Sequence, residues 1–252
     1  MRIRVVCDAG KGIKIPLNYN HYLASVIYSF LETSDPEYAY FLHTDGYLYG
    51  DKHFKLFTFS QLMARHNIEG EYIRFHSIVN WFVSSPQELF LVNFMSSLLE
   101  KRELVVHNNR LMVRDVEIQQ TPIFNQEMKF RCLSPITIST KKERNHKIVT
   151  HYCLPTEPEF SELVRQNLIK KYEIIYDQRP ANDSFTMIFD EEYIKKHGGR
   201  VTKLIRYRDI DIRGVLCPFL AIGSKELMCV GYECGFGDKN SAGFGMVDIV
   251  YR

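Results

Sequence analysis

Long apolar runs are absent from this sequence of 252 residues. No stretch approaches the roughly 20 consecutive apolar residues that span a bilayer, so no membrane segment is expected. The amino-terminal MRIRVVCDAGKG also lacks the apolar core and the small-residue cleavage site of a secretory signal. We therefore expect a cytoplasmic protein that has no membrane partner.

Cysteine pairs at metal-binding spacing are also missing. The six cysteines are scattered, none belongs to a CxxC pair, and no histidine cluster accompanies them at zinc-like spacing. No Asp/Glu pair at metal-ligand spacing lies beside the glycine-rich segment near the carboxy terminus. A chain of this length also needs no disulfide framework to fold. We expect reduced thiols, no metal and no cofactor.

Charge of one sign is not in excess. The 32 Lys and Arg residues nearly balance the 30 Asp and Glu residues, which gives a net charge of +2. This balance neither requires nor excludes a nucleic-acid partner, so the distribution of charge must decide. The most basic stretches are KKERNHK (141–147) and KKHGGRVTKLIRYR (195–208). Taken alone, each is best interpreted as an ordinary solvated surface.

Apolar spacing predicts two similar series of strands and helices. In the first half we expect strands at 2–7, 54–60 and 71–79, helices at 19–31, 34–43 and 85–101, and a hairpin at 103–118 that turns at Asn108-Asn109. Ser85 is expected to cap the helix that Pro86 opens. In the second half we expect strands at 128–140, 184–190, 199–208, 211–223 and 245–252, and helices at 157–176 and 224–235. The apolar stripe of the helix at 157–176 is predicted at Phe160, Leu163, Leu168 and Ile169.

Each series follows the order β–α–β–β–α–β, which is the order of a ferredoxin-like unit. The prediction is therefore an α+β protein with two such domains in tandem. We place the boundary at QTPIF, with the first domain at 1–122 and the second at 123–252.

Five glycines lie in GYECGFGDKNSAGFGMV (231–247), and four of them form two Gly-Phe-Gly units. Glycine accepts a positive φ, and clustered glycines can turn several backbone N–H groups toward an anion. The segment follows a predicted helix and precedes a strand, which is the wrong order for a dinucleotide fingerprint, and it lacks the Gly-Lys-Ser/Thr ending of a Walker loop. The alternative is a tight reversal that packs Phe236 and Phe244 inward.

The glycine-rich pattern closely resembles the carboxy-terminal motif of the CRISPR-associated repeat-RNA endoribonucleases, the Cas-six family of the RAMP proteins. The resemblance extends to IKIPLNYNHYLASVIYSFL (13–31), FLHTDGY (41–47), FKLFTFS (54–60) and FRCLSPITI (130–138), in the family's order. It implies tandem ferredoxin-like (RRM-like) domains with a central cleft. It also implies metal-independent cleavage of CRISPR precursor RNA within each repeat, by 2′-OH attack, leaving a 2′,3′-cyclic phosphate and a 5′-OH.

That chemistry needs two proton-transfer groups and a cation beside the phosphate. In the family the catalytic histidine follows the first long helix, and this position is occupied by His43. The tyrosine of the preceding helix corresponds to Tyr28, and the lysine before the Leu-Phe-Thr strand corresponds to Lys55. His53 is a rival close in sequence, and His21, His66 and His76 are weaker rivals.

RNA contacts are expected from the glycine-rich segment and from one basic strand. The candidates in the segment are Gly235, Gly237, Lys239, Asn240, Ser241, Gly243 and Gly245, whose backbone N–H groups and lysine would face phosphates. Lys203, Arg206 and Arg208 could follow the RNA backbone, and strand alternation would place Arg206 and Arg208 on one face. Phosphate contacts of this kind give affinity rather than sequence choice.

Two other hypotheses stay open. Some relatives lack the histidine and only bind RNA, so the chain could be a non-catalytic binding protein of CRISPR repeat RNA. It could also be a small-nucleotide enzyme whose glycine loop holds a phosphate, which would require a metal or a nucleotide. The expected partners are the CRISPR precursor transcript and other CRISPR-associated interference proteins, and the chain is expected to be a monomer or a homodimer.

Overall fold

The computed structural model describes residues 1–144 and 147–250, which form two compact units. The first unit holds Met1–Thr121 together with Ser241–Gly243, and the second holds Pro122–Asn240 and the chain from Phe244 on. The sequence pattern assigned the whole glycine-rich segment to the carboxy-terminal domain. The structure instead groups the tip of that segment with the amino-terminal unit, because Asn20 Nδ2 donates hydrogen bonds to the carbonyl oxygens of Ala242 and Gly243, each at 3.1 Å.

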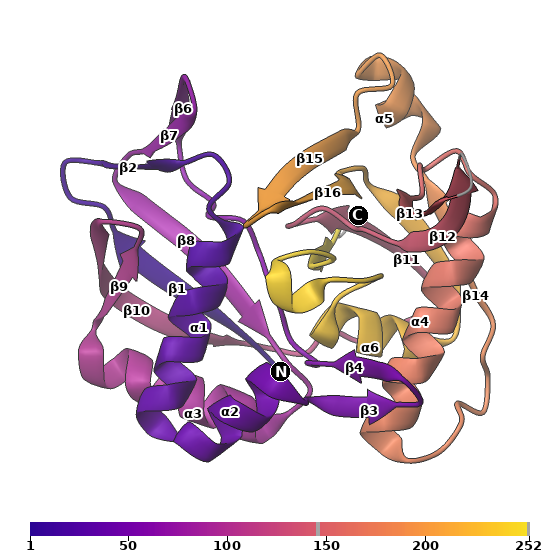
Figure 1. The fold of residues 1–252 in the computed structure, drawn as a ribbon, viewed down its shortest axis with the longest axis horizontal. Coiled ribbons are helices and arrows are strands. Elements are labelled where there is room, and N and C mark those ends of the chain that lie inside the picture. The colour runs from indigo at the N-terminus through magenta and orange to yellow at the C-terminus, as the bar shows by residue number, and fades with distance from the viewer. Residues whose placement is uncertain (145–146, 251–252) are drawn as a thin grey trace. The chain divides into compact units, whose positions relative to one another are not determined.

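The first unit is built on an antiparallel sheet of five strands. Their order across the sheet is β5 (Thr58–Phe59), β8 (Ile78–Ser84), β1 (Arg2–Asp8), β10 (Asn109–Gln119) and β9 (Glu103–Val106). Helix α1 (Asn20–Ser34) follows β1, and α3 (Glu88–Lys101) follows β8. Figure 1 shows these two helices side by side over one face of the sheet. This is the strand order of a ferredoxin-like unit, with β9 added at the edge.

The core of the first unit follows from two periodicities. Every second residue of β1 is buried, at Ile3, Val5 and Cys7, because strand side chains alternate between the two faces. The helices bury one face each, and their buried apolar residues are Leu23, Ala24, Val26, Ile27, Phe30 and Leu31 in α1 and Phe90, Leu91, Phe94 and Leu98 in α3. The alternating strand residues and the apolar faces of the two helices therefore pack into a single core.

Smaller elements complete the first unit. They are the three-stranded sheet of β2 (Ile13–Pro16), β7 (Tyr72–Phe75) and β6 (His66–Glu69), the hairpin of β3 (Tyr47–Tyr49) and β4 (Lys52–Phe54), and helix α2 (Pro36–Thr44). Asp35 caps α2, since its carboxylate accepts a hydrogen bond from the Tyr38 N–H at 3.0 Å.

The second unit repeats the strand order of the first. Its sheet runs β14 (Phe185–Phe189), β17 (Phe219–Gly223), β11 (Glu127–Cys132) and β18 (Val247–Ile249), with α4 (Glu159–Tyr176) after β11 and α6 (Lys225–Cys234) after β17. Phe130, Phe219 and Phe236 pack together in its core, with ring centroids 5.3 to 5.5 Å apart. The prediction of tandem ferredoxin-like units is confirmed.

Two hairpins and a short helix decorate this unit. They are β12 (Ser139–Arg144) with β13 (Lys147–Tyr152), β15 (Thr202–Tyr207) with β16 (Ile210–Val215), and α5 (Glu191–Lys196). The basic stretch at 141–147 is thus part of a hairpin, and its residues 145–146 lie outside the described residues, as do 251–252 at the end of the last predicted strand. None of the helices in the described ranges combines the length and the apolarity needed to cross a bilayer.

Several predicted strands are divided in the structure. The strand at 71–79 breaks at Ser77, whose φ is +56°, so that β7 and β8 belong to different sheets. The strand at 54–60 breaks at Leu56, whose φ is +51°. Pro218 has no N–H for a sheet ladder, and the strand at 211–223 divides there into β16 and β17. The strand at 128–140 divides likewise into β11 and the start of β12.

Helix α3 begins later than predicted. Its N-cap is Gln87, and Ser85 instead lies before the helix, where its Oγ accepts a hydrogen bond from the Gln87 N–H at 3.0 Å. The stripe of α4 also differs. Its buried residues include Val164, Asn167 and Lys171, whereas Leu163 and Ile169 are half-buried.

Candidate active site

The structure brings the three predicted catalytic residues together within the first unit. Tyr28 projects from α1 and His43 from the last turn of α2, and their ring centroids are 5.2 Å apart at an interplanar angle of 81°. Lys55 follows β4, and its Nζ donates a hydrogen bond to the carbonyl oxygen of His43 at 3.0 Å. An imidazole and a phenol from two helices and an ammonium group from the segment after β4 therefore share one patch.

The end of α2 fixes the position of His43. The N–H groups of Asp45 and Gly46 both donate to the carbonyl oxygen of Phe41, at 3.0 and 2.7 Å, which closes the helix just after the histidine. Leu42 is fully buried and anchors this turn, whereas the His43 side chain is exposed. The imidazole can therefore meet a substrate while its backbone is held by the helix.

Gly46 allows Lys55 to lie against this helix end. Its φ is +63°, and a Cβ there would come within 2.6 Å of the carbonyl oxygen of Phe54 and 2.9 Å of Lys55 Cδ. A larger residue would displace the lysine from the histidine. Burial lowers the pKa of Lys55, and Asp45 opposes this shift by its negative charge. A half-buried cation of this kind is screened less by water than a fully exposed one.

Tyr28 lies at the edge of the core. Its ring is half-buried and meets Phe57 edge-to-face at 5.9 Å, in addition to its contact with His43. The apolar contact orients the ring, so the phenol can serve the same patch as the imidazole.

The rival histidines have other contacts. Nδ1 of His53 lies 2.6 Å from the carbonyl oxygen of Asp45, in the exposed β3–β4 hairpin. Nδ1 of His66 lies 2.9 Å from the carbonyl oxygen of Ala64, and Nε2 of His76 lies 3.4 Å from Asn67 Nδ2. None of these contacts involves Tyr28 or Lys55, so His43 is better placed than these three histidines.

The glycine-rich segment forms a tight loop with buried phenylalanines. Gly235, Gly237, Gly243 and Gly245 all have φ between +75° and +88°, which explains the choice of glycine. Phe236 and Phe244 are fully buried, as the tight-reversal alternative predicted. The loop after α6 is therefore a packed element of the core and not an open turn.

The backbone N–H groups of this loop are directed inward at several points. The N–H of Gly235 donates to the carbonyl oxygen of Gly231 at 2.9 Å, and that of Gly245 donates to Pro135 at 2.8 Å. The prediction that these two glycines present N–H groups to phosphates is therefore wrong, because both groups are already used in internal hydrogen bonds. Their role is to permit the backbone path.

A buried lysine that the sequence analysis missed binds the glycine-rich loop through hydrogen bonds. Lys171 of α4 is 2% exposed, and its Nζ donates to the carbonyl oxygens of Gly235 and Gly237 and to Asn240 Oδ1, at 2.7, 2.9 and 2.7 Å. Nδ2 of Asn240 donates in turn to the carbonyl oxygens of Phe236 and Phe244, at 3.3 and 3.0 Å. The side-chain amide of Asn240 is therefore buried and fully engaged within the loop, and the predicted contact of its backbone N–H with RNA stays a prediction.

One turn earlier, α4 makes a second attachment. Asn167 Nδ2 donates to Asp238 Oδ1 at 3.1 Å, while Asp238 Oδ2 accepts from the N–H and the hydroxyl of Ser139 at 3.1 and 3.2 Å. A signal for both contacts was present in the sequence. Lys171 and Asn167 fall on the apolar face of the helix that begins at Phe160, where a polar residue needs a buried partner.

Comparisons with known proteins show which family the chain matches. The family described as "CRISPR associated protein Cas6, C-terminal" matches residues 117–249, and "CRISPR-associated protein Cas6, N-terminal" matches residues 14–117. The chain belongs to the Cas6 family. Together the two matches cover the strands of both ferredoxin-like sheets except β1, as well as the candidate site and the glycine-rich loop.

Individual relatives support the assignment to Cas6. A protein of Methanocaldococcus jannaschii named "CRISPR-associated endoribonuclease Cas6 1" is 36% identical, over 98% of this chain and 92% of its own length. A solved structure titled "CRISPR associated protein Cas6" is 34% identical, with a TM-score of 0.80 over 100% of this chain and 99% of that one. Another, titled "An RAMP protein binding different RNA substrates", is 25% identical, with a TM-score of 0.82 over the whole of both chains.

The remaining predicted RNA contacts of this Cas6 protein lie at separate places. Lys239 is exposed in the loop with φ of +58°, and Ser241 is half-buried beside it. Lys203 and Arg206 are exposed in β15, where Arg206 Nε lies 3.3 Å from Asp211 Oδ1. Arg208 is not in the strand, since it occupies the hairpin turn with φ of +54°, so the argument that alternation puts it on the face of Arg206 is wrong.

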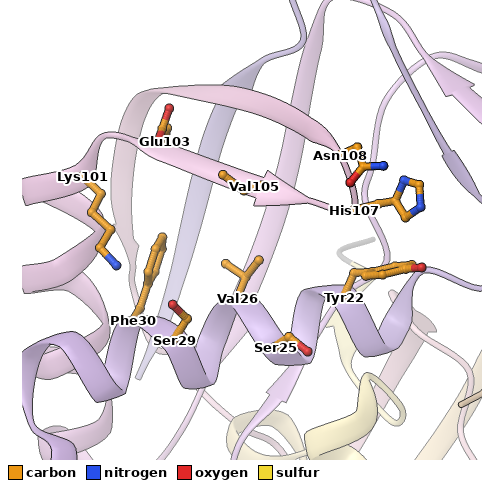
Figure 2. Close-up of a pocket in the computed structure, with 10 residues that line it drawn as sticks. All are labelled: Tyr22, Ser25, Val26, Ser29, Phe30, Lys101, Glu103, Val105, His107 and Asn108. Atoms are coloured by element: carbon orange, nitrogen blue, oxygen red, sulfur yellow. The ribbon is translucent and has the colours of Figure 1, made fainter.

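A pocket of the first unit does not include the candidate catalytic residues. Figure 2 shows it between α1 and the β9–β10 hairpin, with a volume of about 640 Å³. The rings of Tyr22 and His107 meet edge-to-face at 4.9 Å at one end, and Lys101 Nζ lies 5.3 Å from the Phe30 ring centroid at the other. The helical period turns Tyr28 about 200° from Val26, which lines the pocket, so the candidate site and the pocket use different sides of α1.

Replacing Gly245 by alanine should destabilise the protein strongly. A Cβ at this position would lie 2.1 Å from the carbonyl oxygen of Phe236 and 2.5 Å from Asn240 Nδ2, and the backbone would be strained at φ of +80°. We expect the free energy of unfolding to fall by at least about 3 kcal/mol in a denaturant titration. Gly198→Ala is the matched control, because Gly198 has φ of +57° with open space around it, and it should cost only about 1 to 2 kcal/mol. Equal losses would contradict the close packing of the loop.

The ionisation of Lys171 should appear in the pH dependence of stability. Burial lowers its pKa from 10.5 to about 8, so between these values the unfolded chain binds more protons than the folded chain. Relative to Lys171→Met, the wild-type free energy of unfolding should therefore rise by up to about 3 kcal/mol from pH 7 to above pH 10. Denaturant titrations of both proteins across this range test the sign, and a difference that stays constant with pH would exclude a shifted lysine.

Proposed function

We propose that this Cas6 protein is a metal-independent endoribonuclease that cuts CRISPR precursor RNA once within each repeat. The observation that carries the proposal is the meeting of Tyr28, His43 and Lys55 on one patch of a chain that belongs to this family. The Methanocaldococcus jannaschii relative is named an endoribonuclease, which supports the same activity here. Such transcripts are made in the cytoplasm, which is where we place the enzyme.

In the proposed reaction the ribose 2′-OH attacks the adjacent phosphorus. The 2′-oxygen loses its proton as the bond to phosphorus forms, and the leaving 5′-oxygen gains a proton as its bond breaks. His43 and Tyr28 carry these two proton transfers, since both rings share the site and one of them is an exposed imidazole. The products are a 2′,3′-cyclic phosphate and a 5′-OH, so no water and no metal-bound hydroxide enters the balance.

Lys55 stabilises the charge that builds up on the phosphate. One of its N–H groups donates to the His43 carbonyl oxygen, which fixes the ammonium group beside the histidine backbone. The other two N–H groups can meet the non-bridging oxygens of the phosphate. Because the lysine is already held in place, little reorganisation is needed as the transition state forms.

RNA is held by exposed cations in this proposal. Lys239 in the glycine-rich loop and Lys203, Arg206 and Arg208 around β15 contact phosphates. The half-buried Ser241 adds a contact from the loop, and we include the backbone of Gly237 and Gly243 in the same proposal. The RNA-binding RAMP protein of similar structure supports a nucleic-acid ligand for this fold. We further propose that the enzyme acts as a monomer or homodimer and passes its product to other CRISPR-associated proteins.

The direct test is cleavage of the host's own repeat RNA in the presence of EDTA, followed by mapping of both new ends. We expect one cut per repeat and a 5′-OH on the downstream product. The upstream product should lose its terminal phosphate to a phosphatase only after the cyclic phosphate has been opened. Binding without cutting would favour the non-catalytic alternative. Cutting that needs Mg²⁺ and leaves a 5′-phosphate would overturn the proposed chemistry.

A further inference from the structure

Three potential metal ligands from one short segment converge in the second unit. They are His151 at the end of β13, Cys153, and Glu157 just before α4, and one ligand atom of each lies within 4.8 Å of the others. Cys153 is 3% exposed, and the other two side chains are half-buried. The spacing His-x-Cys-x₃-Glu is not a usual zinc signature, so these residues were not predicted as metal ligands.

The backbone holds these three residues in place. The Cys153 N–H donates to the carbonyl oxygen of Ile138 at 3.0 Å, which ties the cysteine to β12. The N–H of Glu157 donates to the carbonyl oxygen of Leu154 at 3.0 Å, and the Leu154 N–H donates to Glu157 Oε1 at 3.2 Å. The turn between Leu154 and Glu157 therefore places the Glu157 carboxylate beside the His151 imidazole, whose Nε2 lies 2.7 Å from Glu157 Oε2.

We propose that this cluster is a zinc-binding site. An imidazole nitrogen, a thiolate sulfur and a carboxylate oxygen form a donor set that zinc accepts, with bonds of about 2.0 to 2.3 Å. In a tetrahedral site two such ligands lie about 3.4 to 3.6 Å apart, a separation that follows from these bond lengths. The carboxylate must move away from the imidazole by under about 1 Å, and the sulfur must approach the other two ligands by at most about 1.3 Å. A water molecule completes the fourth position.

The binding step exchanges a proton for the metal. Zinc forms bonds to Cys153 Sγ, His151 Nε2 and a Glu157 oxygen. The thiol proton is released to solvent, and the neutral imidazole takes the tautomer that carries its proton on Nδ1, so that Nε2 is free to bind the metal. No oxidant or reductant is needed. The proposed RNA cleavage does not use this metal, so the two proposals stand independently.

Lys142 competes with zinc for the same carboxylate. Its Nζ lies 3.3 Å from Glu157 Oε2 and 3.2 Å from Glu159 Oε1, and its side chain is 47% exposed. Displacing an exposed cation of this kind costs little, on the order of 1 kcal/mol or less. Removal of Lys142 should therefore tighten zinc binding by about 2- to 5-fold, the equivalent of an exposed ion pair.

A metal here would strengthen the attachment of α4. Glu157 precedes this helix by two residues, and the same helix carries Asn167 and Lys171, which hold the glycine-rich loop. Zinc that binds the folded chain stabilises it by mass action. We expect the thermal unfolding midpoint to rise in the presence of zinc.

The experiment uses the full chain after removal of bound metal with a chelator. Titration with Co²⁺ should give one equivalent and a thiolate-to-cobalt charge-transfer band, and competition with a chromogenic chelator gives the zinc affinity. Cys153→Ser should abolish the band and weaken zinc binding by at least about 100-fold, since loss of an outer-shell partner alone costs up to that much. Cys229→Ser is the matched control and should leave both unchanged, because this half-buried cysteine belongs to α6.

Two further variants keep the test decisive if Cys153→Ser folds poorly. Glu157→Gln should also weaken zinc binding by at least about 100-fold, and Lys142→Ala should tighten it. Far-ultraviolet circular dichroism checks each fold. Absence of the cobalt band in the folded wild-type chain, equal losses in Cys153→Ser and Cys229→Ser, or weaker binding in Lys142→Ala would each overturn the zinc site.

Discussion

The His43→Ala variant should cut repeat RNA at least about 100-fold more slowly than the wild type, in single-turnover reactions at saturating protein. The imidazole is exposed, so its removal leaves no cavity in the core, and α2 remains closed by the hydrogen bonds to the Phe41 carbonyl oxygen. RNA affinity should change by less than about 3-fold, because the proposed phosphate contacts lie on other residues. The measurement is the rate of product formation together with a filter-binding titration.

His53→Ala is the control for this result. It removes an imidazole ten residues away that contacts the Asp45 carbonyl oxygen and neither Tyr28 nor Lys55. We expect it to cut within about 3-fold of the wild-type rate, by analogy with other surface substitutions. If instead His53→Ala cuts slowly and His43→Ala cuts at the wild-type rate, the proton-transfer role belongs to His53 of the β3–β4 hairpin.

The Lys171→Met variant should lose both stability and RNA affinity. Methionine keeps the length of the side chain but leaves the carbonyl oxygens of Gly235 and Gly237 and the Asn240 amide without their buried donor. We expect the free energy of unfolding at pH 7 to fall by about 2 to 4 kcal/mol, since buried unsatisfied acceptors carry a desolvation cost. RNA should bind at least about 10-fold more weakly, because Lys239 and the loop backbone are no longer held in one conformation.

Hydrogen exchange locates the effect of this substitution. Amides of Phe236 and Asp238, which donate to the carbonyl oxygens of Gly245 and Thr137, should lose protection first. Lys195→Met, on the exposed face of α5, is the matched control and should change stability by less than about 0.5 kcal/mol. A Lys171→Met protein with wild-type loop protection and RNA affinity would show that the lysine does not shape the loop.

The sequence predicted the fold because its signals were periodic. The alternation of Ile3, Val5 and Cys7 and the stripe of α1 each follow from a local repeat, and both recur in the structure. The divided strands were missed because a single residue at positive φ, such as Ser77, can end a strand without leaving a compositional mark. Element type was therefore easier to predict than strand boundaries.

The candidate site was predictable only in part. Tyr28, His43 and Lys55 were found through the family resemblance, and their proximity depends on tertiary packing that no local pattern shows. Lys171 was missed because a lysine in a helix is usually solvated, although its place on the apolar face of α4 was a signal that it needs a buried partner. The cluster of His151, Cys153 and Glu157 was missed because it depends on a turn that sequence spacing does not reveal.

The most direct measurement of the proposed mechanism uses a repeat RNA with a single 2′-deoxy nucleotide at the mapped cleavage position. The account predicts that this RNA binds the wild-type protein with unchanged affinity and is not cut, because the attacking oxygen has been removed. Cutting of the deoxy substrate at the same bond and at a comparable rate would contradict it, since another nucleophile would then be at work.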